Sequence, residues 1–473
     1  MRITIMAAML LAAAPVAPLG AQATRSISAS DKAQGAQANP ELLAQYGGKY
    51  AGPQVAFVDR VGKRVALQSG LSNAADDFTI TLLNSPIENA FAIPGGYVYV
   101  TRQLLALMNS EAELASVLGH EVGHVAANHA SKRNTRATIG SILAAGIGAA
   151  TGSGLLSQIA GTGAQLYTLG FSRSQEYQAD GLGVRYSYAA GYSPYAMSRM
   201  LTQLNNETTL QGQIAGRTSS VPSFASTHPN GAARIAKARE LAQATGKPED
   251  RPAQDIVFLK MLDGMVYDDD PGQGVVAGQT FRHPGLRIAF TAPAGYQIAN
   301  GSDAVTIQGS GGQAQFTLGT ATSDLGAAIT QRFTTLGANG ASAPVQTGRT
   351  NGIDYSFATT AATASGRAVD ATVVAYRFPN ATYLFTIITP QGAGIGPFGS
   401  LVSSMTTISA GDAAAVKGKR LRILTVGRGD TIDTLAAKMA YPNFQRERFL
   451  TLNGLASTSV LTRGMLVKIV TES

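Results

Sequence analysis

The sequence contains no cysteine, which excludes disulfide bonds, thiolate zinc sites, iron–sulfur clusters and cysteine nucleophiles together. Charged residues are also scarce, at 14% of the chain against about 25% in average soluble proteins, so long charged disordered tails are excluded. Any catalysis must therefore rely on histidine, serine, threonine, lysine or carboxylates.

Apolar residues are plentiful, since they make up 45% of the 473 residues. That content is enough for two or three domains, each with a core of its own. The 37 basic and 29 acidic residues give a net charge of +8. This modest excess suits an acidic polymer or a membrane surface, but it does not argue for nucleic-acid binding.

The first residues predict export. Met1-Arg2 is a short basic start, residues 3–18 are apolar, and Ala21-Gln22-Ala23 has the small-x-small pattern of a signal-peptidase site. We expect a signal peptide over 1–23 that is cleaved after Ala23, rather than a membrane anchor, because the apolar core is shorter than the ~20 residues that span a bilayer. A cysteine-free exported protein suits the bacterial periplasm.

The remaining chain predicts an α+β protein with several parts. No glutamate occurs between Glu249 and Glu447, and from about residue 275 the chain is rich in Thr, Ser, Gly and Ala with alternating apolar runs, which is typical of strands. One helix is expected within that region, at Leu325 to Leu336. The predicted parts are an N-terminal linker (24–50), a mostly helical domain with a small sheet (51–250), a β-rich domain whose role the sequence does not indicate (256–410) and a small C-terminal module (417–473).

Within residues 51–250, apolar spacing and capping residues predict the elements. Ser110 with Glu113, and Ser172 with Gln175, form capping-box patterns that start two helices, the first reaching about Ala130. The other expected elements are a helix from Gln54 to Gln68, a strand from Phe78 to Leu83, a strand-like run from Phe91 to Thr101 with the turn Pro94-Gly95-Gly96 inside it, helices after Ser193 and Pro229, and a polar loop from Glu207 to Ser226.

The sequence His120-Glu121-Val122-Gly123-His124 lies in the middle of the first capped helix. At 3.6 residues per turn, the two histidines lie on one face, one turn apart, so both imidazoles can reach a single ion. Glu121 is placed beside them. This HExxH pattern predicts a zinc site with a neighbouring general base.

A catalytic zinc usually has three protein ligands, so a third must be found. His129 is one candidate, but the metzincin spacing requires glycine and histidine where this chain has Ala127 and Ala130, so that subclass is excluded. We expect His129 to end the helix instead, where a cationic side chain suits the dipole. Glu176 is the better candidate, and Asp180 on the same helix face could accept a hydrogen bond from a ligating histidine. An acidic pair at this spacing is usually a solvated helix face, so the choice of Glu176 depends on family resemblance.

Three motifs resemble one known family. They are His120 to His124, the run Asn89 to Thr101, and Ser172 to Asp180. Together they are similar to the family of HtpX and the CAAX prenyl endopeptidases, the forty-eighth metallopeptidase family. The exported branch that resembles bacterial BepA and LoiP fits best, because no set of transmembrane helices is evident. The resemblance covers Pro53 to Gly246, under half of the chain.

By this resemblance, one zinc ion per chain is held by His120, His124 and Glu176. Glu121 is then the general base and Asp180 the outer partner of a ligating histidine. His228, in Thr227-His228-Pro229, resembles the downstream histidine of the family, which can occupy or approach the open zinc position. We expect a catalytic role for it, either by stabilising the oxyanion or by holding the site closed.

The expected reaction is hydrolysis of peptide bonds by water that zinc activates, with Glu121 taking its proton. The run Asn89-Ala90-Phe91-Ala92 is expected to offer an edge strand to which a substrate adds through backbone hydrogen bonds. Such binding depends on the extended backbone of the substrate more than on its side chains. It suits a protease that acts on misfolded or unassembled proteins of the cell envelope.

Two further segments bear on partners. Between Arg136 and Arg173 no charged residue occurs, and we expect a helix pair beside or over the active site, with peripheral membrane contact as the alternative. The module at 417–473 is similar to a LysM module, a strand, two helices and a strand that bind peptidoglycan. Its linker containing Pro442 departs from that pattern, which leaves a small docking domain as the other reading.

Other functions remain open at this point. The main alternative to a protease is a periplasmic chaperone-like or peptidoglycan-binding scaffold whose zinc site is latent. Peptidoglycan hydrolysis is disfavoured, because the LysM-like end supplies binding and no catalytic residues.

Overall fold

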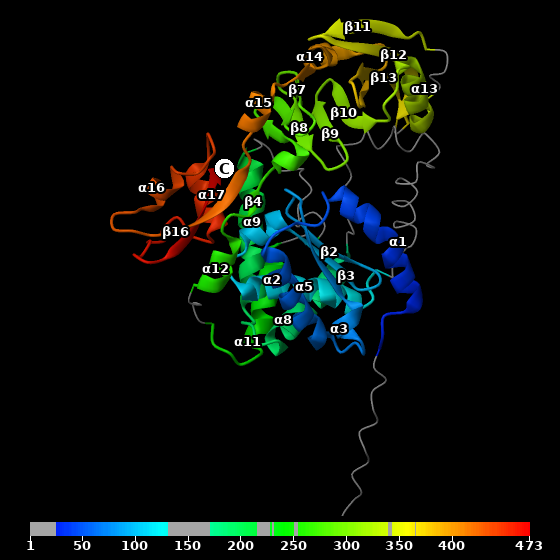
Figure 1. Ribbon diagram of the computed structural model, residues 1–473. Coiled ribbons are helices and arrows are strands. Elements are labelled where there is room, and N and C mark those ends of the chain that lie inside the picture. Colours follow the sequence, from blue (N-terminus) through cyan, green and yellow to red (C-terminus); the bar gives the residue numbers. More distant parts are fainter. Residues whose placement is uncertain are drawn as a thin grey trace, which may run out of the picture.

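The computed structural model describes residues 25–130, 171–214, 228, 231–249, 254–338, 343–364 and 366–473. The predicted signal peptide, most of the uncharged stretch after Arg136 and the segment 215–227 lie outside the described residues. Figure 1 shows the N-terminal half at the centre, the β-rich region above it and the C-terminal module at its side.

A three-stranded sheet lies in the N-terminal half. Its strands are β1 (Thr79–Leu83), β2 (Ala90–Ile93) and β3 (Tyr97–Thr101), in the order β1-β3-β2. β1 runs parallel to β3, whereas β2 is antiparallel to it. The run Phe91 to Thr101 is therefore a hairpin, as its internal turn predicts, and Gly95 and Gly96 adopt the positive φ angles of that turn. β2 is an edge strand of this sheet.

Helices surround this sheet, and the helix α5 lies at their centre. It packs against α2, α8 and α9. The helices of this half are α2 (Gln54–Ala66), α3 (Ala74–Asp77), α4 (Arg102–Leu107), α5 (Glu111–Ala126), α8 (Arg173–Ala189), α9 (Ala196–Ile214) and α11 (Ala232–Gln243), with a 3₁₀ turn at Leu67–Ser69. The helices predicted after Gln54, Ser110, Ser172 and Pro229 are confirmed.

Two expectations about this half are wrong. The supposed linker at 24–50 forms the helix α1 (Ala29–Gln45), whose residues Ala38 and Leu42 are buried. It lies so close to the β2–β3 turn that a Cβ atom on Gly35 would meet the carbonyl oxygen of Pro94. The polar stretch after Glu207 also continues α9 to Ile214, because Glu207 is buried on the inner face of that helix.

The β-rich region contains two sheets. A seven-stranded sheet has the order β11-β12-β13-β14-β10-β9-β8, and a four-stranded sheet has the order β15-β7-β6-β5. One apolar core joins the two sheets, and a second lies under α13 (Leu325–Leu336), the helix expected there. The other elements are β5 (Val275–Ala277), β6 (Thr280–His283), β7 (Ile288–Thr291), β8 (Gln297–Asn300), β9 (Val305–Gly309), β10 (Gly312–Gly319), β11 (Gln346–Thr350), β12 (Ile353–Ala364), β13 (Arg367–Arg377), β14 (Thr382–Pro390), β15 (Thr406–Thr407), α14 (Gly399–Ser404) and the 3₁₀ turns Pro271–Gln273 and Gly396–Phe398.

The C-terminal module follows α15 (Ala410–Ala415) and has the order strand, helix, helix, strand. Its elements are β16 (Lys419–Thr425), α16 (Ile432–Ala436), α17 (Gln445–Leu452) and β17 (Leu466–Glu472). β16 pairs with β17 on one side and with β4 (Val266–Tyr267) on the other. β4 and α12 (Ile256–Leu262) thus join the C-terminal module, although they precede the β-rich strands in the sequence. The resemblance of this module to LysM and the domain limits stay predictions.

Among the described helices, none has both the length and the apolar character that crossing a membrane requires.

Candidate metal and catalytic site

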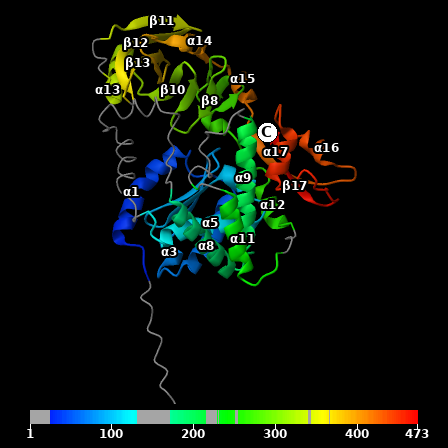
Figure 2. The same ribbon diagram turned by 180° about the vertical axis from the view of Figure 1, so that it is seen from behind.

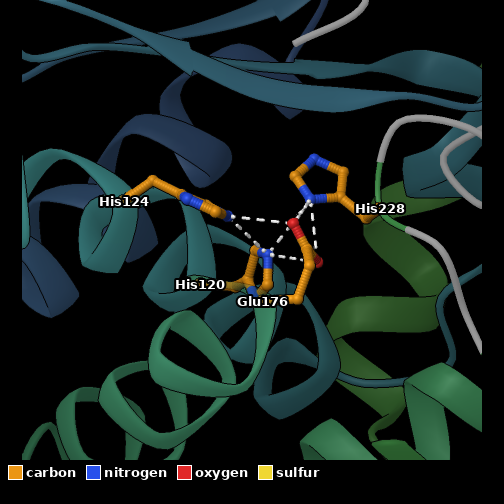
Figure 3. Close-up of side chains that lie close together, drawn as sticks. All are labelled: His120, His124, Glu176 and His228. Carbon is orange, nitrogen blue, oxygen red and sulfur yellow. Dashed lines mark hydrogen bonds and ion pairs between the residues drawn. The ribbon is translucent and has the colours of Figure 1, made fainter. Parts of the chain in front are cut away.

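Four side chains converge in the N-terminal half. They are His120 and His124 on α5, Glu176 on α8, and His228, and one ligand atom of each lies within 4.8 Å of those of the others. All four are buried, with exposed fractions of 1–2%. Figure 3 shows the three imidazoles and the carboxylate pointing toward one another. The sequence-predicted ligands are therefore brought together.

The two helices can carry these ligands because they approach each other closely. Ser110 accepts a hydrogen bond from Glu113 N and starts α5, but the Glu113 side chain accepts from Asn109 N and does not complete the predicted capping box. Ser172 and Gln175 cap α8 reciprocally, as predicted. Where the helices meet, a Cβ atom on Gly119 would lie 3.1 Å from Gly183 O, and one on Gly123 would lie 3.0 Å from Leu182 Cβ. Glycines at i and i+4 of α5 thus provide the close contact that brings Glu176 to the histidine pair.

Five of the six separations between the four ligand atoms are close to those of a tetrahedral zinc site. His120 Nε2 lies 3.0 Å from His124 Nε2 and 3.2 Å from His228 Nδ1, which in turn lies 3.0 Å from Glu176 Oε1. The other two measured edges, from Nε2 of each α5 histidine to the Glu176 carboxylate, are both 3.6 Å. Bonds of about 2.0–2.1 Å to a tetrahedral zinc place neighbouring ligand atoms about 3.3 Å apart.

Hydrogen bonds around the cluster fix which ring nitrogens face it. His129 Nε2 donates to Gln178 Oε1 over 3.0 Å, so in the neutral ring His129 Nδ1 accepts from His124 Nδ1 over 2.9 Å. His120 Nδ1 likewise donates to Asp180 Oδ1 over 3.0 Å. The Nε2 atoms of His120 and His124 are therefore unprotonated, and their lone pairs face each other. Two facing lone pairs fit a cation between them.

Asp180 and Arg234 form the support behind the ligands. Arg234 Nε and an Nη atom donate to the Asp180 carboxylate over 2.8 and 2.7 Å, and Arg234 also lies 2.8 Å from Glu176 Oε2. Burial by itself raises the pKa of Asp180, but the hydrogen bonds from Arg234 and His120 outweigh it and hold the pKa at about 2. The pKa of Glu176 is also lowered, because the interactions with His228, His120 and Arg234 outweigh the effect of burial. Both carboxylates therefore stay ionised.

Glu121 is the one acidic group of the site left without a hydrogen bond. Both of its carboxylate oxygens are buried and have no hydrogen-bond partner, and Oε1 lies 3.6 Å from His228 Nε2. Burial raises the pKa of Glu121, although His228 and His120 act in the opposite direction. A buried carboxylate without a donor is costly, so a hydrogen-bonding molecule at this position would satisfy it.

His228 lies inside the cluster. Burial lowers its pKa, but the charges of Glu121 and Glu176 outweigh this effect and raise it. Its carbonyl oxygen accepts a hydrogen bond from Arg234 over 3.1 Å. His228 is therefore the fourth member of the cluster, next to Glu121.

His129 corrects a further expectation. The helix α5 ends at Ala126 rather than near Ala130, and Asn128 turns the chain with a φ of 54°, so His129 does not end the helix. It folds back instead, with 1% of its surface exposed, onto His124. Phe171 stacks on the face of the His124 ring at a centroid distance of 3.8 Å. Helical spacing could not reveal these contacts, because they depend on the turn after α5 and on α8.

The predicted substrate strand borders the site. Ala90, Phe91 and Ala92 belong to the edge strand β2, whereas Asn89 is tied into the hairpin, since its amide donates to Thr101 Oγ1 and its side chain to Tyr46. A cavity of about 140 Å³ lies at the end of this strand. It is lined by Ile27, Ala92, Ile93, His124, Val125 and Phe171, among others. The substrate role of the strand stays a prediction.

Comparison with known proteins agrees with this geometry. Residues 54–242 match Peptidase family M48. The chain is 31% identical over 225 residues to "Mitochondrial metalloendopeptidase OMA1" of Schizosaccharomyces pombe, covering 46% of this chain and 63% of that protein. It is 29% identical to "Beta-barrel assembly-enhancing protease" of Yersinia pestis, covering 43% and 42%, and 28% identical to the protein of that name in Escherichia coli O157:H7, covering 50% and 46%.

The chain spans less than two thirds of the length of each of these relatives. The matched segment nevertheless contains α2 to α9, with the HExxH helix and Glu176. Residues 54–242 therefore form a segment that matches peptidase family M48, and over this segment the chain is similar to proteins named as metalloendopeptidases.

Proposed function

We propose that this protein is a zinc-dependent metalloendopeptidase of the bacterial cell envelope, which hydrolyses peptide bonds in misfolded or unassembled envelope proteins. The observation that carries the proposal is the buried tetrahedral set of His120, His124, Glu176 and His228 beside the unpartnered carboxylate of Glu121. Relatives named as metalloendopeptidase and as beta-barrel assembly-enhancing protease support the reaction and the substrate class.

His120, His124 and Glu176 are proposed to hold the zinc ion. When bound, zinc supplies Lewis-acid chemistry, which polarises the scissile carbonyl and makes water a nucleophile near neutral pH. Asp180 and His129 keep the two α5 imidazoles in the tautomer whose Nε2 is unprotonated and can bind a metal. Arg234 holds Asp180 and Glu176 in place through charged hydrogen bonds.

Glu121 is proposed as the general base. Its oxygens face the cluster without a hydrogen bond, so an attacking water can donate to them. Its raised pKa lets the carboxylate take that proton and pass it to the leaving amine. General acid–base catalysis of this kind contributes ~10²–10⁴-fold in rate.

His228 is proposed to hold the site closed when no substrate is present. With this histidine, four protein groups surround the metal position, whereas a catalytic zinc site needs one position for water or substrate. A substrate would therefore displace the imidazole, which could then donate from either nitrogen to the developing oxyanion. The same closed set is what favours the alternative function, a periplasmic chaperone-like scaffold with a latent zinc site.

The edge of β2 is proposed to bind the substrate backbone. Among the described residues, Ala90 to Ala92 pair with β3 alone, so an extended peptide could add on the other side. Every second side chain of such a peptide would face the site. One of them could enter the cavity beside His124 and Phe171.

The test compares the purified wild-type protein with Glu121→Gln on an unfolded substrate protein. The substitution keeps the shape of the side chain and removes the base, so we expect cleavage to fall at least ~10²-fold while zinc binding is retained. Equal cleavage by both proteins would contradict the role of Glu121. Zinc binding and substrate retention without cleavage in the wild type would instead support the scaffold.

A further inference from the structure

The C-terminal module is not a separate body tethered to the peptidase half. One apolar core contains Leu114 and Val117 of α5 together with Leu421, Phe449 and Val467 of the module. The helix α17 packs against α4 and α9, and α12 packs against β16 and β17. Figure 2 shows α17 and β17 beside α9 and α12. Residues more than 300 positions apart in the sequence therefore share one core.

A lysine from this module enters the peptidase half. Lys468 lies on β17 with 0% of its surface exposed. Its ammonium group donates to the carbonyl oxygens of Ala106, Leu107 and Met108, over 2.7, 3.1 and 2.7 Å. These carbonyls are at the C-terminal end of α4, where a helix leaves its acceptors unsatisfied and favours a cation.

Both ends of this contact are held in place. The side chain of Asn453 accepts from Lys468 N over 2.7 Å and donates to Lys468 O over 2.9 Å. Nearby, the amide of Gln203 on α9 donates both to Leu107 O and to Thr451 O of α17, over 2.8 and 2.9 Å. The lysine is therefore part of a hydrogen-bonded joint that spans the two units.

The joint lies directly before the helix that carries the metal ligands. Met108 is the C-cap of α4, and α5 begins at Glu111 after the cap residue Ser110. Glu113, in the first turn of α5, accepts from Asn109 N over 2.7 Å, so the turn and the helix are joined. His120 lies nine residues beyond Glu111, about 13 Å along a rigid helix at 1.5 Å per residue.

We propose that Lys468 is a positioning residue for the active site and that the C-terminal module braces the metal-binding helix through it. This inference rests on the proposed function, because the position of α5 matters most when His120 and Glu121 must meet a metal and a substrate. It concerns a segment outside residues 54–242, the part that matches the peptidase family.

The physical reason is that one charged group joins three successive carbonyls, of which Leu107 O also accepts from Gln203 and Asn109. Without the ammonium, the three acceptors at the end of α4 lose the charged donor that fixes their direction, and the turn at 108–110 can shift. A shift of the first turn of α5 moves the whole helix, since its backbone hydrogen bonds make it a rod. A displacement of about 1 Å at reacting groups can lower a rate by about 10²-fold.

The charge balance of the joint agrees with this role. Burial lowers the pKa of Lys468 to about 7, and the charge of Glu113 acts in the opposite direction. Burial raises the pKa of Glu113, while Asn109, Arg199 and Lys468 lower it. Glu113 and Lys468 thus each favour the charged form of the other, against the effect of burial.

The test uses the full-length protein with Lys468→Met, which keeps an unbranched apolar side chain one atom shorter and removes the donor. Lys438→Met is the matched control, because Lys438 is an exposed lysine of the same module. We measure zinc dissociation constants, kcat and KM on an unfolded substrate, and amide hydrogen exchange at Asn109 and Glu113. Asn453→Ala, which loosens the backbone of Lys468 but keeps its charge, is the second variant should Lys468→Met not fold.

For Lys468→Met we expect zinc affinity to fall 10- to 100-fold, kcat to fall by about 10²-fold with KM little changed, and amide exchange at the start of α5 to rise while the β-rich region is unaffected. Asn453→Ala should act in the same direction and more weakly, and Lys438→Met should match the wild type. The proposal is overturned if folded Lys468→Met has wild-type zinc affinity and wild-type amide exchange at Asn109. If Lys468→Met does not fold, the same result for Asn453→Ala overturns it. Should the wild type cleave nothing, the proposed function fails, and zinc affinity and exchange still decide the role of Lys468.

Discussion

Substituting Asp180 by asparagine tests the support of the metal site most directly. Asp180 accepts from His120 Nδ1 and receives two hydrogen bonds from Arg234, and it is 1% exposed. Asparagine keeps the size of the side chain but loses the charge, and its amide group would turn a donor toward Arg234 or toward His120. In either orientation, the buried amide group of the asparagine would face an N–H group of Arg234 or His120 instead of an acceptor.

The expected loss can be worked out from these contacts. The pKa of Asp180 is about 2 in the folded protein against an ordinary value of 3.8. At 1.36 kcal/mol per pKa unit, this difference corresponds to ~2 kcal/mol of stabilisation of the ionised form. Breaking a buried ion pair on one side costs about 3–5 kcal/mol, so a free energy of unfolding lower by ~2–4 kcal/mol is expected for the metal-free protein.

Metal affinity should fall as well. A carboxylate behind a ligating histidine fixes the ring and its tautomer, and its loss costs about 10- to 100-fold in metal affinity. Urea unfolding of the metal-free protein and competition titration with a zinc chelator measure the two effects separately. Asp433→Asn is the matched control, because it breaks an aspartate–arginine pair of 2.6 Å that is exposed and remote from the site.

Asp433→Asn should lower the free energy of unfolding by no more than about 1 kcal/mol and leave zinc affinity unchanged, since exposed ion pairs contribute little to stability. If Asp180→Asn folds with the stability and zinc affinity of the wild type, the assignment of Asp180 as the partner of a metal-ligating His120 is wrong. If Asp180→Asn and Asp433→Asn lower the free energy of unfolding equally, the buried Asp180–Arg234 pair contributes no more to stability than an exposed one.

The remaining predictions concern acid, the base, the helix turn and the N-terminal helix. Because the folded pKa of Asp180 lies below its unfolded value, its contribution to stability is complete above about pH 4 and is lost as pH falls toward 2, which acid unfolding monitored by circular dichroism should show. Glu121→Gln should retain one equivalent of zinc by metal analysis, and loss of that metal would make Glu121 a ligand rather than a base. His129→Ala should weaken zinc binding ~10-fold by freeing the ring of His124, whereas an unchanged chelator titration would contradict its positioning role. Gly35→Ala should lower the free energy of unfolding by about 1–3 kcal/mol, because its methyl group would collide with the β2–β3 turn; an unaltered urea midpoint would show that α1 does not pack there.

Local patterns in the sequence were sufficient to predict the two helices that carry His120, His124 and Glu176. Four-residue spacing places His120 and His124 on one face of any α-helix, and the capping residues Ser110 and Ser172 mark where the two helices start. The hairpin β2–β3 and the helix α13 were likewise predictable, since turn glycines and apolar periodicity are properties of the chain itself. The choice of Glu176 came from family resemblance, because an acidic pair on a helix is otherwise a common solvated face.

Other features depended on contacts between distant segments. The helix α1 was read as a linker, because its polar composition hides the few small residues that pack against the sheet. The helix α9 continues through a polar stretch for a similar reason, since only its inner face is buried. The place of His129 could not be read from helical spacing, because the chain leaves the helix at Asn128 and reverses direction.

The sequence by itself determined the chemistry, namely which groups can bind a metal and which can move a proton, because those properties belong to side chains and to helical spacing. The tertiary structure alone decided how these groups are held. Gln178 and His129 set the ring of His124, Arg234 holds the carboxylates, and Lys468 reaches the start of α5 from the far end of the chain. These contacts join residues that no short-range pattern connects, since the energy of burying apolar surface, rather than local propensity, brings their elements together.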